Sequence, residues 1–596
     1  MESSPTTMSV IIAATYTAEP VQPVLSAWLE RSGLEPEIRF APFNQVHQQL
    51  LDPGSLLAGN RGGVNVLLVR PRDLGVDSPS RARAAAREVA AALDEAVSRD
   101  GTPTLVMECP APDRGEVEET FAADLADQLG DVSGVEVLDA GEMARLYPVG
   151  DPFDPGGDEA ARVPYREEMF AALATYLARR IIALRRKPYK VIAVDCDDTL
   201  WSGVCGESGP RGVVVDASRK AFQRFLMERR AEGYLLCMVS KNGAADVEAV
   251  FRENPEMVIP REAFVDAAIN WQPKSANLIE LAGRLGIGLD GFLFLDDNPS
   301  ELAEVEANAP AVLAVRMPED PAELPEFLDH LWVLDRAEQS AEDTQRADFY
   351  HDEARRREMR ERAPSFTDFI ENLQLEVEIK PVTGGDVARA SQLTRRTNQF
   401  NSCPRPRDET AMVEACRGMQ PVSVSARDRF GDYGTVGLML TCEDAGWLWV
   451  ETFLLSCRAL GKGVEHRMVR HLGRLALKLG FGEVAVSFEE TGCNQPCHDL
   501  LESMCDGRWE DGLRVIPAAK AASCLLRPMV VKSNGNAGMA SVPLADPAMV
   551  ARIANELRTV EAILAWTAPE VLARPELGER FVSPRGGASQ APACPA

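Results

Sequence analysis

The feature that most constrains this chain is an apolar strand that ends in a cluster of acids. Residues 191–207 read VIAVDCDDTLWSGVCGE, so Asp195, Asp197 and Asp198 follow the apolar run within four positions. An apolar run without alternation is typical of a strand that is buried on both faces, as in a parallel sheet. Folding alone does not require carboxylates gathered at its end. We therefore interpret these acids as part of a functional site.

The same pattern recurs at two later strands. YLLCMVSKN is an apolar run that ends at Ser240, and GFLFLDDN is another that ends at Asp296. In an open α/β sheet the carboxyl ends of the strands share one crevice, where ligands bind. We expect the polar ends of the three strands to meet there, with Lys274 of the downstream PKS stretch nearby. Alternatively, each acid caps a helix or lies on a solvated loop.

This set of residues matches the needs of phosphoryl transfer. Asp195 is the candidate nucleophile and a ligand of Mg²⁺, and Asp197 is the candidate acid/base, its backbone carbonyl also facing the metal. Asp296 completes the metal site, with Asp297 as a ligand or close neighbour. The candidates for holding the phosphate are Thr199, Ser240, Lys241, Asn242 and Lys274.

Composition excludes several classes of partner. The chain has 63 basic and 91 acidic residues among 596, a net charge of −28. This charge argues against non-specific binding to nucleic acid and to an anionic membrane surface. We find no apolar window of membrane-spanning length and no basic leader at the N-terminus, and we expect a cytoplasmic protein. The 13 cysteines follow no disulfide framework.

The length is too great for one core, and the pattern of elements predicts a multidomain α/β protein. Residues 1–186 alternate between strands and helices, and a second alternating series occupies residues 187–338. A highly charged helical connector (340–365) opens a third region, 339–530, which has antiparallel-looking strands followed by a helix. Residues 531–596 contain one amphipathic helix (547–566) and a tail that we expect to be disordered.

The ordered motifs DxDxT, VSKN, PKS and LDDN resemble those of the haloacid dehalogenase-like superfamily. With DDTLWSGVCGE, NWQPKSANL, LTRRTNQFN, FGDYGTVG and LLSCRALGKGVE, the chain looks like a member of the FkbH-like family over about residues 8–510. The resemblance implies an SGNH-hydrolase-like α/β domain, a haloacid dehalogenase-like Rossmannoid phosphatase domain and a GNAT-like α+β domain. The first of these lacks a GDS nucleophile motif, so we expect it to be structural or to dock a partner.

The resemblance also implies an activity. Such proteins take a three-carbon unit from 1,3-bisphosphoglycerate, remove its phosphate and load D-glycerate onto the phosphopantetheine thiol of an acyl carrier protein for polyketide-type synthesis. This chemistry gives Cys205 a purpose, because a thiolate can attack an acyl phosphate and carry the glyceryl group as a thioester. The alternative for Cys205 is a packing role.

The stretch CRALGKGVE (457–465) follows an apolar strand and leads into a helix. A glycine-rich turn at a helix N-terminus can present N–H groups to phosphate. The stretch resembles the acyl-CoA-binding turn of GNAT acyltransferases, which would assign pantetheine or CoA binding to Arg458, Gly461, Lys462 and Gly463. Alternatively, the fold is retained without a ligand.

Two other functions stay open. The chain could be a stand-alone small-molecule phosphatase that needs Asp195 but not Cys205. It could instead be a non-catalytic docking scaffold of an assembly line, which would release no phosphate and form no acyl-enzyme.

Overall fold

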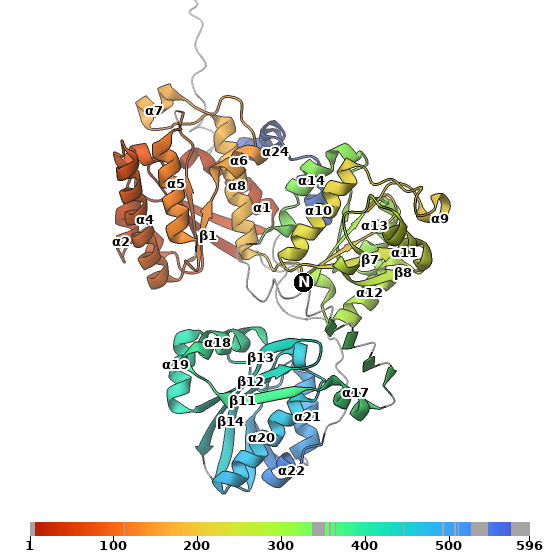
Figure 1. Cartoon of the computed structure of the whole chain (residues 1–596). Coiled ribbons are helices and arrows are strands. Elements are labelled where there is room, and N and C mark those ends of the chain that lie inside the picture. The colour runs from red at the N-terminus through yellow and green to blue at the C-terminus, as the bar shows by residue number, and fades with distance from the viewer. Residues whose placement is uncertain are drawn as a thin grey trace, which may run out of the picture.

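Three β-sheets organise the chain, which we describe from a computed structural model (Figure 1). The structure describes residues 6–336, 352–525 and 546–573, apart from residues 113, 131, 354, 357, 358, 361, 364, 445, 492, 493, 506, 507 and 511. We call residues 6–186 the first unit, 187–336 the second unit and 365–525 the third unit. The predicted multidomain α/β architecture is confirmed; the domain boundaries stay a prediction, as does the connector helix, which lies largely outside the described residues.

The first unit contains a parallel sheet in the order β2-β1-β3-β4-β5. Its central strands are apolar on both faces: Val10 and Ile12 of β1 enter one core cluster, and Ile11 and Ala13 enter another. The strands are β1 (Thr6–Ala14), β2 (Leu34–Phe40), β3 (Val64–Val69), β4 (Thr104–Glu108) and β5 (Val135–Leu138). The helices are α1 (Gln22–Arg31), α2 (Val46–Leu51), α3 (Leu56–Gly59), α4 (Pro79–Asp100), α5 (Glu116–Leu129), α6 (Ala140–Leu146), α7 (Pro155–Ala161) and α8 (Glu167–Arg185).

The second unit has a parallel sheet in the order β10-β9-β6-β7-β8. Strand order reverses at β6, so its carboxyl end is the topological switch point at which ligands bind in open α/β sheets. The strands are β6 (Val191–Val194), β7 (Leu235–Ser240), β8 (Phe264–Ile269), β9 (Phe292–Asp296) and β10 (Leu313–Arg316). The helices are α9 (Cys205–Ser208), α10 (Ala217–Ala231), α11 (Ala244–Glu253), α12 (Lys274–Leu285), α13 (Pro299–Asn308) and α14 (Leu324–Asp329).

The third unit has a mixed sheet in the order β11-β12-β13-β14-β15-β17-β16. The strands pair antiparallel except for β14 and β15, which run parallel on either side of α20 in the chain. The strands are β11 (Glu376–Pro381), β12 (Gln420–Arg427), β13 (Asp432–Asp444), β14 (Trp447–Leu455), β15 (Glu483–Ser487), β16 (Trp509–Glu510) and β17 (Leu513–Pro517). The helices are α17 (Phe366–Leu373), α18 (Val387–Arg396), α19 (Glu409–Gly418), α20 (Val464–Leu479), α21 (Gln495–Cys505) and α22 (Ala518–Ala522).

The C-terminal region differs from the single helix predicted over 547–566. Two helices, α23 (Pro547–Asn555) and α24 (Val560–Ala573), are separated by a short turn. The hydroxyl oxygen of Thr559 accepts a hydrogen bond from the Ala562 N–H at 3.2 Å, as a residue that begins a new helix does. The predicted tail, 583–596, lies outside the described residues.

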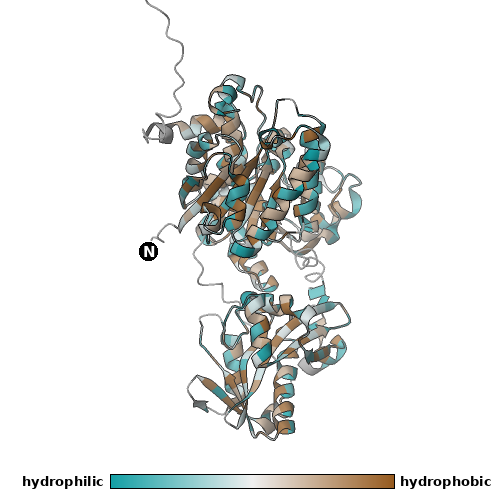
Figure 2. Ribbon diagram, turned by 90° about the vertical axis from the view of Figure 1, so that its left-hand side faces the viewer, coloured by the Kyte–Doolittle hydropathy of each residue, from teal (hydrophilic) through white to brown (hydrophobic). Residues whose placement is uncertain are grey.

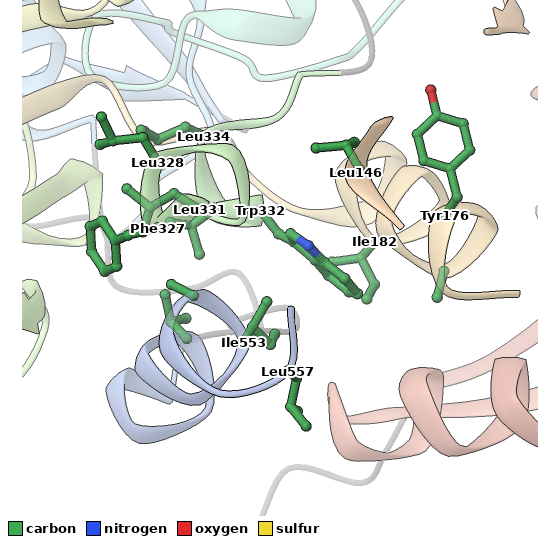
Figure 3. Packing of buried hydrophobic residues seen from close by; sticks show 14 of the residues in the cluster. Leu146, Tyr176, Ile182, Phe327, Leu328, Leu331, Trp332, Leu334, Ile553 and Leu557 are labelled. Atoms are coloured by element: carbon green, nitrogen blue, oxygen red, sulfur yellow. The ribbon is translucent and has the colours of Figure 1, made fainter. Parts of the chain in front are cut away.

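This C-terminal helix pair packs against both the first and the second unit. Trp28 of α1 contacts Trp332, which follows α14, at a ring separation of 4.6 Å, and contacts Trp566 of α24 at 4.5 Å. Figure 3 shows Ile553 of α23 near Trp332; Leu557, two residues after this helix, and Phe327 belong to the same buried cluster. The first and second units therefore share one apolar core with helices that come after the third unit in the chain.

Figure 2 shows hydrophobic strands in the interior of the upper part of the molecule, with more hydrophilic helices around them. Among the described residues, no helix combines the length and apolar character that crossing a membrane requires.

Candidate active site

The carboxyl ends of β6 and β9 bring Asp195 and Asp296 to one buried position. Lys274, the first residue of α12, lies between them: its Nζ is 3.2 Å from Asp195 Oδ2 and 2.5 Å from Asp296 Oδ2. Asp296 is fully buried, and Asp195 and Lys274 are 7% and 2% exposed. Strands β6 and β9 are adjacent and parallel, which explains why residues about 100 positions apart meet here.

This site has the donors that a hard divalent cation requires. Asp195, Asp296 and Asp297 each offer an oxygen atom, and these atoms lie within 4.8 Å of one another. Within the described residues, Asp195 Oδ1 is buried without a hydrogen-bond partner. A buried unpaired carboxylate oxygen is costly unless a ligand satisfies it. Because Mg²⁺ prefers carboxylate oxygens, the residues fit this metal.

The electrostatics of the site favour an added positive charge. Burial raises the pKa of Asp195, an effect that Lys274 opposes and Asp296 reinforces. Burial also raises the pKa values of Asp296 and Asp297. A single lysine therefore does not compensate the carboxylates fully, and a divalent cation would lower all three pKa values.

Asp197 is hydrogen-bonded to the loop that follows β6. Its Oδ1 accepts hydrogen bonds from Trp201 Nε1 at 2.8 Å and from the Cys205 N–H at 3.1 Å. Its Oδ2 accepts one from Asn242 Nδ2 at 3.0 Å. Asp197 thus fixes the loop that carries Cys205 and connects it to the end of β7.

Cys205 begins α9 beside this carboxylate. Its Sγ lies 3.6 Å from Asn242 Oδ1, and the residue is 2% exposed. Burial raises the pKa of the thiol to about 12, and the neighbouring Asp197 carboxylate raises it further. The thiol is therefore protonated at neutral pH, and its reaction as a nucleophile requires a base.

The residues predicted to hold phosphate fall into two groups. Thr199 and Ser240 are buried beside the carboxylates, and Thr199 Oγ1 donates to Asp297 Oδ1 at 3.3 Å. Asn242 Nδ2 donates to Ser240 Oγ at 3.0 Å as well as to Asp197. Lys241, in contrast, pairs with Glu301 of α13 at 2.8 Å. This contact with Glu301 was not predicted, because no local sequence pattern shows which side chain of another element will meet a lysine.

The predicted glycine-rich turn connects β14 to α20 in the third unit. Gly461 and Gly463 have positive φ angles of 76° and 87°, which only glycine adopts easily. The Lys462 ammonium donates to the Arg458 carbonyl at 2.7 Å, and the Arg458 guanidinium lies 3.5 Å from the Thr435 carbonyl. The buried Glu465 accepts the Gly463 N–H through its Oε1 at 3.3 Å. A carboxylate therefore occupies part of the predicted phosphate-binding turn.

A short segment of the same unit fills the gap beside β14. β14 pairs with β15 only over Leu448–Val450, and beyond this point Ser402 donates its N–H to the Phe453 carbonyl at 3.0 Å. The Leu455 N–H donates to the Phe400 carbonyl at 2.9 Å. The protein's own TRRTNQFN region thus covers the strand edge that follows the parallel pair.

No protein-family model matches the chain, and no curated protein does. Among solved structures, the chain is similar to the N-terminal part of the protein BF1531 from Bacteroides fragilis, which contains a phosphatase domain complexed with Mg. The identity is 19%, the match covers 56% of this chain and 95% of that one, and the TM-score is 0.48.

The chain is also similar to acetyltransferases over about a quarter of its length. The ribosomal-protein-S18-alanine N-acetyltransferase from Escherichia coli matches at 13% identity over 24% of this chain and 94% of that one, with a TM-score of 0.19. The GNAT family N-acetyltransferase YhbS from Escherichia coli, solved in complex with CoA, matches at 15% identity over 25% of this chain and 86% of that one, with a TM-score of 0.19.

Proposed function

We propose that the protein is a Mg²⁺-dependent glyceryl transferase and phosphatase. It takes the D-glyceryl unit of 1,3-bisphosphoglycerate, removes the phosphate and transfers the acyl group through Cys205 to the phosphopantetheine of an acyl carrier protein. The observation that carries this proposal is the series of neighbours from Asp195 through Ser240 and Asn242 to the sulfur of Cys205, because phosphoryl and thiol chemistry would then share one crevice.

The phosphoryl half uses Asp195. Its carboxylate attacks phosphorus, the bond from phosphorus to the substrate oxygen breaks, and water later hydrolyses the aspartyl phosphate. Asp197 delivers the proton that the leaving alkoxide needs. Thr199, Ser240 and Lys274 would hold the phosphoryl oxygens. When bound to Asp195, Asp296 and Asp297, Mg²⁺ would offset the repulsion between carboxylate and phosphate.

The acyl half uses Cys205. Sulfur attacks the acyl-phosphate carbonyl, a carbon–sulfur bond forms, and inorganic phosphate leaves. The thiol proton passes to a base, and Asp197 is the candidate because its carboxylate already accepts the Cys205 N–H and faces the thiol. The carrier-protein thiol then takes the glyceryl group by thioester exchange. The order of acylation and dephosphorylation stays open.

In the third unit, Arg458, Gly461, Lys462 and Gly463 remain the candidates for holding the carrier's pantetheine. A role as a scaffold without a ligand is the alternative, which the position of Glu465 in the turn and the covered β14 edge favour.

The deciding experiment weighs the protein and a holo carrier protein intact after incubation with 1,3-bisphosphoglycerate and Mg²⁺. We expect a glyceryl adduct on the wild type and its transfer to the carrier. Cys205→Ala should form no adduct, and Asp195→Asn should keep a phosphorylated adduct. Release of free glycerate without any adduct would instead identify a stand-alone phosphatase, and no reaction would identify a scaffold.

A further inference from the structure

The turn before Lys274 carries a large aromatic side chain that points into solvent. Trp271 follows β8 and is 75% exposed, the highest value among the large hydrophobic side chains of the described residues. Most tryptophans in a folded domain are largely buried, and in this chain Trp28, Trp201 and Trp332 are. An indole left in water beside a candidate active site therefore needs an explanation.

The exposure of Trp271 does not result from a loose loop. The preceding Asn270 donates its N–H to the Ser240 carbonyl at 3.1 Å. The side chains of Asn270 and Asn277 exchange two hydrogen bonds of 3.0 and 3.1 Å, and the Gln272 N–H donates to Asn270 Oδ1 at 2.9 Å. These hydrogen bonds hold the chain in place on both sides of the tryptophan.

The turn is also continuous with the site. Asn270 contacts Ser240, Ser240 contacts Asn242, and Asn242 contacts the sulfur of Cys205. Val204, the residue before Cys205, is 38% exposed. Because β7 and β8 are parallel and Lys274 lies only three residues after Trp271, the turn that carries Trp271 is at the same carboxyl edge of the sheet as the site, and we call this turn the rim of the site.

The chemistry of the indole indicates which of the proposed reactants, the phosphorylated substrate or the carrier arm, it would bind. The face of an aromatic ring is negative, so it attracts neither a phosphate nor a carboxylate. A phosphopantetheine arm, in contrast, carries methyl groups and amides that pack well against an indole, and rigid tryptophans of this kind dominate binding energies.

We propose that Trp271 is the contact through which the rim of the site holds the phosphopantetheine arm while its thiol approaches Cys205. This inference rests on the proposed function, because it takes the carrier arm as the acyl acceptor. Trp271 is a positioning residue here and takes no part in bond making.

The test measures binding of two probes, phosphopantetheine and inorganic phosphate with Mg²⁺, by calorimetry on the full chain. We expect Trp271→Ala to weaken phosphopantetheine binding about tenfold or more and Trp271→Phe to weaken it less, since a ring remains. Phosphate affinity should change less than about twofold, because the ring does not attract anions. Phe43→Ala, at an exposed aromatic of the first unit, is the matched control and should change neither affinity.

Equal phosphopantetheine affinities in wild type and Trp271→Ala, or no phosphopantetheine binding by the wild type, would overturn the assignment. Parallel loss of both affinities would also overturn it, because it would indicate a disturbed site. The proposed function is tested separately by carrier loading. If the protein loads the carrier and the Trp271 substitutions leave phosphopantetheine binding unchanged, only the role of Trp271 is contradicted.

Discussion

The ammonium of Lys274 lies 2.5 Å from Oδ2 of Asp296 in a position where Asp296 has no contact with solvent. Asp195 shares the same ammonium at 3.2 Å. One ammonium thus compensates the charge of both buried carboxylates. Removing any one of the three side chains should therefore change the charge balance of the other two.

Replacing Lys274 with methionine should destabilise the protein strongly. The substitution leaves two buried carboxylates facing each other without a cation, and breaking a buried pair costs about 3–5 kcal/mol. Urea titration, followed through the unfolding transition that includes the second unit, measures the loss of unfolding free energy. Lys187→Met is the matched control, because its ion pair with Asp290 is half exposed and should contribute less than about 1 kcal/mol. Equal losses in the two variants would contradict the expected difference.

Replacing Asp297 with asparagine should weaken Mg²⁺ binding. The variant keeps the shape of the side chain but removes one of the three negative charges that surround the candidate cation position. We expect an affinity loss of about tenfold or more, measured by calorimetry with Mg²⁺ alone. Asp290→Asn, at an exposed carboxylate before the opposite end of β9, should bind as the wild type does. An unchanged affinity in Asp297→Asn would remove this residue from the metal site.

Glu108, the last residue of β4, should make stability depend on pH. It is 3% exposed, Arg114 donates to its Oε2 at 2.9 Å, and burial raises its pKa to about 7. The folded state therefore favours the protonated form. The stabilisation is complete below the ordinary pKa of glutamate and is lost as the pH rises through about 7.

Glu108→Gln should remove this loss. Relative to wild type, the variant should gain about 1–3 kcal/mol in unfolding free energy between pH 5 and pH 8, as measured by denaturant titration at both values. Glu207→Gln, at an exposed carboxylate in α9, should follow the wild type at both pH values. If the unfolding free energies of Glu108→Gln and the wild type changed equally between pH 5 and pH 8, the Glu108 carboxyl would already be ionised in the folded protein at pH 5.

Removing the Trp566 side chain should loosen the contact between the first two units. The Arg31 guanidinium lies 3.9 Å from the Trp566 ring centroid, and Trp28 lies 4.5 Å from it. Trp566→Ala should cost about 3–5 kcal/mol, a typical value for an aromatic side chain deleted from a core. Calorimetric scans should show a lower transition temperature for the first and second units with the third unit's transition unchanged. A uniform shift of all transitions, or none, would contradict this localisation.

Replacing Glu465 with glutamine tests the turn before α20. The amide oxygen of glutamine can still accept the Gly463 N–H, while the negative charge is removed. If the turn binds the phosphates of CoA or of a carrier arm, the variant should bind CoA about tenfold more tightly than the wild type. Calorimetry on both proteins provides the comparison. Absence of CoA binding in both would support the alternative of a scaffold without a ligand.

The sequence predicts the crevice of the second unit well, for a local reason. Asp195, Ser240 and Asp296 each close an apolar run, and parallel strands bring such ends to one edge. The topological switch point at β6 depends on the order of the strands in the sheet, and no single apolar stretch of sequence reveals that order. The functional roles of these residues stay predictions.

Contacts between distant elements were beyond sequence reasoning. The pairing of Lys241 with Glu301 depends on where α13 begins relative to the residue that follows β7, and the hydrogen bond from Trp201 to Asp197 depends on the path of one loop. The continuous helix predicted over 547–566 was wrong, because helical periodicity continues across the turn that Thr559 caps. Periodicity reports the buried face of a helix and does not reveal a change of direction between two helices.

The position of α23 and α24 has a consequence for biosynthesis. On the ribosome, Trp28 and Trp332 emerge well before Trp566, so the apolar seam they form stays open while the third unit is being made. Growing chains with such uncovered surfaces are prone to misassembly and are typical clients of chaperones. The apolar seam is therefore covered only after residues 546–573 leave the exit tunnel.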